Sequence, residues 1–217
     1  MPLAVDMCEG AYWFINDDDV LFGDMYYENM IRVVNDGFLC GRVGRVLDSD
    51  RDNAEEGHEM DHVPSNPVLF AEDLVCDYVG QVWAGRIEWL RAAWRHPPSS
   101  IETSEDFWIS AVLKTKYGIS SKVPMCPRPV NGYNFNTEMC ACSLKASRKH
   151  EKARVSGTTV KNKVRPIVIN NIITDYNYKV LKRESFDLYQ KFRKGYDVSP
   201  YEIVNKTEWN QRCWHWV

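Results

Sequence analysis

The sequence predicts an α/β fold in which helices flank a mixed β-sheet. Short apolar runs rich in β-branched and aromatic residues alternate, over residues 1–130, with amphipathic stretches of helical spacing. Glycine or proline follows several of these segments, where helices and strands usually end. The chain has 217 residues, 44% of them hydrophobic and 26% charged, which suits a globular protein with one sizeable core.

The first predicted elements are a strand, a helix and a second strand. Residues 11–16 form an apolar run that leads into acidic residues, which is typical of a buried strand with a polar tip. A helix is expected between an N-cap at Asp24 and a left-handed glycine, Gly37. Its apolar positions at helical spacing are Tyr27, Met30, Ile31 and Val34. Residues 38–47 have the β-rich composition of the second strand.

Residues 48–62 are polar and mostly charged, so they are expected to form a loop. The elements expected after this loop are a strand at 74–79, an amphipathic helix at 86–96, a helix from a cap at Thr103 or Ser104 to Tyr117, and a strand at 121–125. Pro97 is expected to end the first of these helices and Gly118 the second, because proline cannot continue a helix and glycine adopts the left-handed C-terminal conformation.

Beyond a core at residues 1–130, an irregular C-terminal extension is expected over residues 131–217. Within it we predict a strand at 164–173, at a sheet edge because Pro166 lacks a backbone donor, and a helix at 178–192. Residues 143–165 are strongly basic. They are expected to form a solvated cationic face, with added charge near bound phosphates as the alternative.

Composition excludes some classes of function. The net charge of −3 argues against a dedicated nucleic-acid binder. No apolar run approaches the roughly 20 residues that span a bilayer, and residues 1–10 lack the pattern of a signal peptide, so we expect no membrane span and a cytoplasmic location. The seven cysteines contain no Cys-x-x-Cys pair. They are expected to be reduced structural thiols, with disulfides in a secreted protein as the alternative.

Three consecutive aspartates, Asp17, Asp18 and Asp19, follow the first predicted strand. Adjacent carboxylates repel one another, and a divalent cation such as Mg²⁺ or Mn²⁺, which prefers oxygen ligands, offsets that repulsion. Alternate residues of an extended tip point the same way, so Asp17 and Asp19 are expected to share one face. The alternative is a solvated acidic turn before the first helix.

Two later segments also carry candidate functional residues. Glu105 and Asp106 lie in the first turn of a predicted helix, where they either favour the helix dipole or supply a general base for a sugar hydroxyl. Gly80 lets a ligand approach the backbone, and Trp83 offers a ring for stacking on a sugar. The alternative for this second segment is a tight strand-to-helix turn with Trp83 in the core.

The three candidate segments occur in a fixed order along residues 10–130. They are Asp17-Asp18-Asp19-Val20, then Asp77-Tyr78-Val79-Gly80 with Trp83, then Glu105-Asp106-Phe107-Trp108 leading to Lys116-Tyr117-Gly118. This ordered set resembles the GT-A glycosyltransferases, in particular the branch related to family 2. That family has a DxD-type triplet, a glycine-rich acceptor segment and an acidic helix start. The resemblance implies a partial GT-A-like sheet.

The resemblance also implies an activity, the metal-dependent transfer of a sugar from a nucleotide-sugar donor to a glycan, lipid or protein acceptor. Asp17 and Asp19 would bind Mn²⁺ or Mg²⁺, and Asp17 and Asp18 would contact the donor. Asp106, with Glu105 as its neighbour, would be the catalytic base of an inverting reaction. The substrate-binding positions that the resemblance implies are Gly80, Gln81, Val82, Trp83 and Trp108.

The chain departs from this family before the triplet. Only sixteen residues precede Asp17, whereas the family places its nucleotide-binding half there, so a truncated chain or a separate donor-binding subunit is expected. His150 is a candidate third metal ligand, with a surface position as the alternative. Two other functions stay open. One is a non-catalytic remnant that binds a glycan or a partner, and the other is a metal-dependent nuclease or phosphotransferase, which the basic residues at 145–165 favour.

Overall fold

The computed structural model describes residues 9–16, 20–45, 47, 62–63, 73–98, 100, 103–125, 141–143 and 164–179. Its elements are β1 (Tyr12–Asn16), β2 (Val20–Phe22), α2 (Tyr26–Asn35), β3 (Leu39–Arg45), β4 (His62–Val63), β5 (Leu74–Cys76), β6 (Tyr78–Arg86), α3 (Ile87–Ala93), α4 (Glu105–Tyr117), β7 (Ser121–Val123), β8 (Ala141–Ser143) and α7 (Arg165–Asp175). None of these helices is long and apolar enough to cross a membrane.

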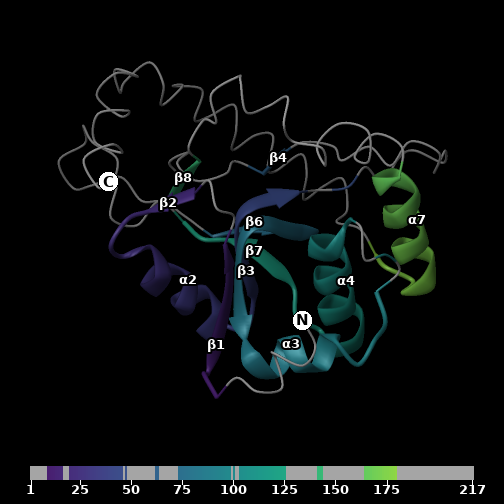
Figure 1. Ribbon diagram of the computed structural model, residues 1–217, viewed down its shortest axis with the longest axis horizontal. Coiled ribbons are helices and arrows are strands. Elements are labelled where there is room, and N and C mark those ends of the chain that lie inside the picture. The colour runs from purple at the N-terminus through teal and green to yellow at the C-terminus, as the bar shows by residue number, and fades with distance from the viewer. Residues whose placement is uncertain are drawn as a thin grey trace.

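A six-stranded mixed sheet forms the centre of the fold (Figure 1). Its strand order is β1-β6-β3-β7-β5, and β4 pairs with β3 outside this path. The pairing of β3 with β7 is parallel and the other pairings are antiparallel. A separate antiparallel ribbon joins β2 to β8. The predicted α/β class with a mixed sheet is therefore confirmed.

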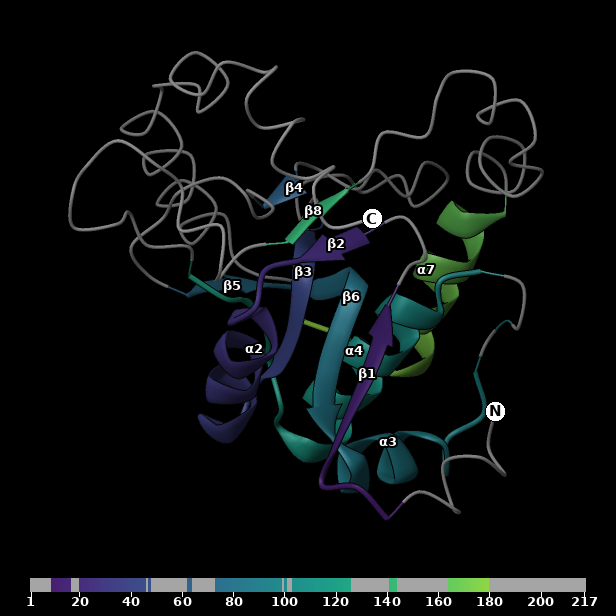
Figure 2. The same ribbon diagram turned by 60° about the vertical axis from the view of Figure 1, so that its left-hand side comes forward.

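Helices cover both faces of the central sheet. Figure 2 shows β1 and β6 side by side, and α2 and α4 lie on opposite sides of the sheet in Figure 1. The smaller core lies between α2 and the sheet and contains Tyr26, Met30 and Val82. The larger core lies on the α4 side and includes residues of α3, α4 and α7, among them Phe107 and Ile169. Part of the predicted C-terminal extension thus belongs to the main hydrophobic core.

The prediction of an edge strand at residues 164–173 is wrong, because this segment forms helix α7. Pro166 lies in its first turn, where the missing N–H would have no partner within the helix in any case. The side chains of Val168, Ile169 and Ile172 are buried against the larger core. Packing against α4 therefore outweighs the strand preference of these β-branched residues.

The predicted strand at 74–79 is two strands, and the second one does not end at Gly80. Strand β6 continues through Gly80 to Arg86, where α3 begins directly. It pairs with β3 at Tyr78–Gly80 and again at Trp83–Ala84, and with β1 from Val82 to Arg86, so the ladders continue the strand past the glycine. The segment 80–83 is consequently part of a central strand and is not a strand-to-helix turn.

The three helices predicted in residues 24–118 are confirmed, but their N-caps differ from the expectation. Asp24 does not cap α2; Met25 occupies that position without a side-chain hydrogen bond. Ser104 precedes α4 as predicted, with a left-handed φ of 67° and no capping hydrogen bond. At the C-termini, Gly37 and Gly118 have φ values of 92° and 71°, as the sequence predicts.

Several expectations fall on residues outside the described part of the chain. The predicted loop at 48–62 lies there except for His62, which pairs in β4. The basic residues at 143–165 are also outside it, apart from Ser143, Val164 and Arg165. Of the predicted helix at 178–192, only Tyr178 and Lys179 are described, and neither is helical.

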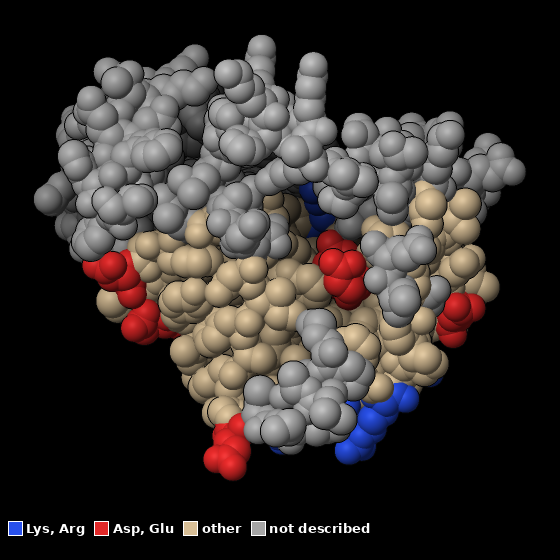
Figure 3. Space-filling view, in the orientation of Figure 1, with Lys and Arg blue, Asp and Glu red and all other residues tan. Residues whose placement is uncertain are grey.

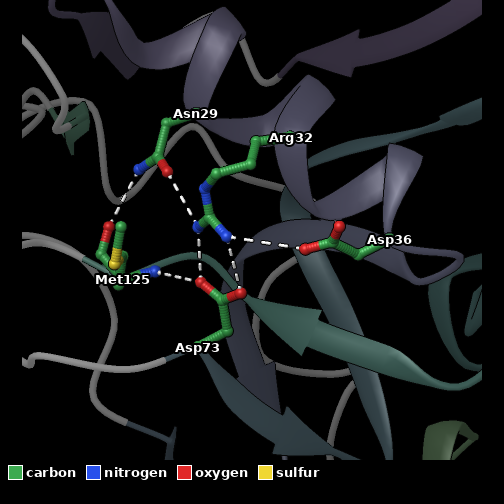
Figure 4. A network of polar contacts seen from close by, with 5 residues as sticks. All are labelled: Asn29, Arg32, Asp36, Asp73 and Met125. Atoms are coloured by element: carbon green, nitrogen blue, oxygen red, sulfur yellow. Dashed lines mark hydrogen bonds and ion pairs between the residues drawn. The ribbon is translucent and has the colours of Figure 1, made fainter.

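A polar network holds α2 against the edge of the central sheet (Figure 4). Arg32 on α2 donates two hydrogen bonds to the carboxylate of Asp73, at 2.9 and 2.6 Å. Asp73 also accepts from the backbone N–H of Met125 at 2.9 Å, and Asn29 donates to the Met125 carbonyl at 2.8 Å. The network thereby fixes the residue before β5 and the end of the segment after β7 to one helix.

Replacing Asp73 by Asn is expected to lower the free energy of unfolding at neutral pH but not in acid. Burial alone would raise the pKa of the Asp73 carboxyl, but hydrogen bonds from Arg32 and the Met125 N–H outweigh it and hold the pKa below its usual value of 3.8. A carboxyl whose pKa is depressed by folding stabilises the protein above its unfolded-state pKa and loses that effect as the pH falls through the folded-state pKa.

Urea unfolding of both proteins between pH 7 and about pH 3 measures this difference. The gap between wild type and Asp73→Asn should stay constant above about pH 5 and shrink below about pH 4. If the difference in unfolding free energy between the two proteins stayed the same down to about pH 3, the charge on the Asp73 carboxylate would contribute nothing to stability.

Candidate active site

Asp106 and Gly80, which the sequence places in separate candidate segments, lie against each other. Asp106 is in the first turn of α4, and Gly80 is near the beginning of β6. A Cβ atom built on Gly80 would lie 3.2 Å from Oδ2 of Asp106 and 4.0 Å from its Cβ. The missing side chain at position 80 therefore lets the carboxylate approach the backbone of the central strand.

The two acids at the start of α4 have different surroundings. Glu105 is exposed, whereas Asp106 is half-buried between the helix and the sheet. Oδ1 of Asp106 accepts a hydrogen bond from the Phe107 N–H at 2.8 Å, and the Ser110 hydroxyl donates to the Asp106 carbonyl at 2.8 Å. Of the two predicted catalytic carboxylates, Asp106 is the one that the structure brings against the predicted acceptor segment.

The acidic triplet Asp17 to Asp19 lies outside the described residues, but the residues on both sides of it are placed. Asn16 ends β1 and pairs with Val82 of β6. Val20 begins β2 and is buried in the core beneath α2. The end of β1 therefore lies beside Val82, where Asn16 donates to the Tyr27 hydroxyl on the α2 side of the sheet at 3.2 Å, and the start of α4 lies beside Gly80 on the other side.

Gln81 lies between Gly80 and Val82, and its backbone is left-handed with φ of 63°. Its side-chain oxygen accepts a hydrogen bond from Nη1 of Arg42 on β3. Arg42 is buried, with 5% of its surface exposed. The pairing of β3 with β6 shifts register next to it, between Gly41 and Val43. Sequence reasoning did not select Arg42, although a lone cation amid the apolar and small residues 39–44 was a usable signal.

The other predicted substrate-binding side chains fill the core. Trp83 is 5% exposed and packs edge-to-face on Trp13 with ring centroids 6.4 Å apart. Trp108 is 1% exposed, and its Nε1 donates to the Tyr176 hydroxyl at 3.3 Å. Val82 is fully buried on the α2 side of the sheet. A substrate role for these three residues stays a prediction that their burial does not support, so Gly80 and Gln81 are the stronger candidates.

The predicted metal ligands cannot be compared with any placed side chains. Asp17, Asp19 and His150 all fall outside the described residues. Within the part of the chain that the structure describes, no three His, Cys, Asp or Glu side chains gather closely enough to hold a metal ion. The divalent cation therefore stays a prediction based on the triplet.

Charges of both signs occur on the face of the molecule that Figure 3 draws. Figure 3 shows acidic side chains near the middle of the face, beside a basic side chain that lies deeper.

No protein-family model matches the chain, and no curated protein matches it either. The function of the chain is therefore inferred from how the residues of β1, β6, α4 and β3 are arranged.

Proposed function

We propose that the chain is a metal-dependent glycosyltransferase that moves a sugar from a nucleotide-sugar donor to a hydroxyl of a glycan, lipid or protein acceptor. The observation that supports it best is the contact between the Asp106 carboxylate and Gly80. This contact lies beside Val82, the partner of the residue that precedes the acidic triplet. If the proposal holds, the acidic triplet and Asp106 flank one sugar.

In the proposed reaction, Asp106 accepts the proton of the acceptor hydroxyl. The hydroxyl oxygen forms a bond to the anomeric carbon of the donor sugar while the bond from that carbon to the diphosphate breaks. Attack from the side of a single base, opposite the leaving group, inverts the configuration at the anomeric carbon. A divalent cation held by the hard carboxylate oxygens of Asp17 and Asp19 would supply charge neutralisation for the departing diphosphate.

The position of Gly80 suits this role for Asp106. A general base must come within about 2.6–3.2 Å of the proton donor that it serves. A Cβ atom on residue 80 would lie 3.2 Å from Oδ2 of Asp106, so the glycine lets this carboxylate lie close to the β6 backbone, while Oδ1 accepts the Phe107 N–H. The backbone on this side of β6 would then form one wall of the acceptor site.

Incubation of the full chain with Mn²⁺ and a panel of nucleotide sugars and acceptors tests the proposal. We expect release of nucleoside diphosphate together with a glycosylated acceptor, and loss of both when the cation is chelated. The variants Asp17→Asn and Asp19→Asn should abolish turnover, and Asp36→Asn, an exposed aspartate on the far end of α2, is the matched control. Turnover that survived chelation and both triplet variants would remove the cation from the reaction.

A further inference from the structure

Arg42 of β3 is a buried cation that the proposed mechanism does not use. Its guanidinium group donates to the side-chain oxygen of Gln81, and only 5% of the residue is exposed. Burying a guanidinium group is costly, so a protein retains one where its hydrogen bonds fix a particular geometry or serve a site. We propose that Arg42 is a positioning residue of the proposed active site and acts through Gln81. This inference rests on the proposed function.

The unusual backbone conformation of Gln81 explains why a hydrogen bond from Arg42 is needed to stabilise it. A φ of 63° is rare for a residue with a side chain, because Cβ then crowds the following carbonyl group. Such conformations persist where surrounding contacts over-determine them. The hydrogen bond from Arg42 holds the Gln81 side chain from the neighbouring strand and so favours this conformation.

The backbone conformation of Gln81 affects the position of Gly80 relative to Asp106, the proposed base. Gly80 precedes Gln81, and a Cβ atom built on Gly80 would lie 3.2 Å from Oδ2 of Asp106. The β3–β6 register shifts at this point, since Gly41 pairs with Trp83 but Val43 pairs with Gly80. Irregularities of this kind re-aim the strand locally and are frequent beside active sites. Release of Gln81 into ordinary extended geometry would move the Gly80 backbone relative to the Asp106 carboxylate.

The test is a double-mutant cycle on Arg42→Met and Gln81→Gly. Glycine adopts a positive φ without strain, so Gln81→Gly should hold the backbone geometry without help from Arg42. We expect Arg42→Met alone to lower kcat by about 10- to 100-fold while the KM for the donor stays unchanged. In the Gln81→Gly background, the same replacement should change kcat by less than about twofold. Arg86→Met, at the opposite end of β6 and half-buried, is the matched control.

Equal losses of kcat from Arg42→Met in both backgrounds would overturn the inference, because Arg42 would then act on the substrate directly. If Arg42→Met raised the KM for the donor and left kcat unchanged, the positioning role of Arg42 would also be overturned. Urea midpoints of the same four proteins provide a readout that needs no turnover. Arg42→Met should lower the midpoint in the wild-type background and not in the Gln81→Gly background.

The two readouts separate failure of this inference from failure of the proposed function. If no donor is turned over by the wild-type protein, the glycosyltransferase proposal is lost, and the urea cycle alone decides whether Arg42 acts through Gln81. If turnover is found but the cycle shows no coupling in kcat or in the urea midpoint, the role of Arg42 is lost and the proposed function stands.

Discussion

Asp106→Asn is expected to lower the turnover of sugar transfer by about 10²- to 10⁴-fold, the usual contribution of a general base. An asparagine keeps the shape of the side chain and can still accept the Phe107 N–H, but its amide does not take a proton from an acceptor hydroxyl. The fold should be retained, since the main core does not include this side chain.

The measurement is steady-state kcat for Asp106→Asn beside the thermal midpoint of the same protein. Glu105→Gln is the matched control, because Glu105 is the adjacent acid in the same helical turn and is exposed to solvent. We expect it to change kcat by less than about twofold, as surface substitutions usually do. Full turnover in Asp106→Asn, or an equal loss in Glu105→Gln, would show that Asp106 is not the base.

Asp77→Ala is expected to lower the free energy of unfolding by about 3–5 kcal/mol, the usual cost of removing one partner of a buried ion pair. Asp77 is fully buried between β5 and β6. Its carboxylate accepts the Leu47 N–H at 2.9 Å and the Tyr178 hydroxyl at 3.2 Å, and it lies 3.6 Å from Nζ of Lys114. Loss of the carboxylate leaves the Leu47 N–H without its acceptor and removes the negative charge beside Lys114, although the Tyr178 hydroxyl keeps the Asp77 carbonyl.

Chemical unfolding of Asp77→Ala and two comparison variants measures this effect. Tyr178→Phe removes one donor and leaves the carboxylate in place, so a loss of about 1 kcal/mol is expected. Asp36→Ala removes an aspartate that is 58% exposed and should change stability by about 0.5 kcal/mol or less. A loss for Asp77→Ala no larger than that for Asp36→Ala would contradict the central place of this carboxylate in the core.

Asp77 also shows how the C-terminal part of the described chain is attached. Tyr178 follows α7, yet its hydroxyl donates to both the carbonyl and the carboxylate of Asp77. Lys114 of α4 donates to the Tyr178 hydroxyl at 3.2 Å and to the Lys179 carbonyl at 2.8 Å. These contacts join segments more than sixty residues apart, which explains why residues near 178 are part of one folded unit with the sheet.

The sequence by itself determined the elements whose signals are local. The apolar run of β1, the helical spacing in α2 and the glycines that end α2 and α4 predict these elements close to their observed positions. It also identified Gly80 and Asp106 as candidates, since a glycine after a strand and an acid in a first helical turn are visible without coordinates.

Only the tertiary structure decided how distant segments meet. Residues 164–173 have β-branched side chains that favour a strand locally, but burial of their apolar face on α4 makes them helix α7. Pairing with β3 continues β6 through Gly80 and pairing with β1 begins at Val82, which no periodicity within residues 74–86 could reveal. The contact of Asp106 with Gly80 and the bond from Arg42 to Gln81 join different elements, so they arise from packing between helices and strands and not from local propensity.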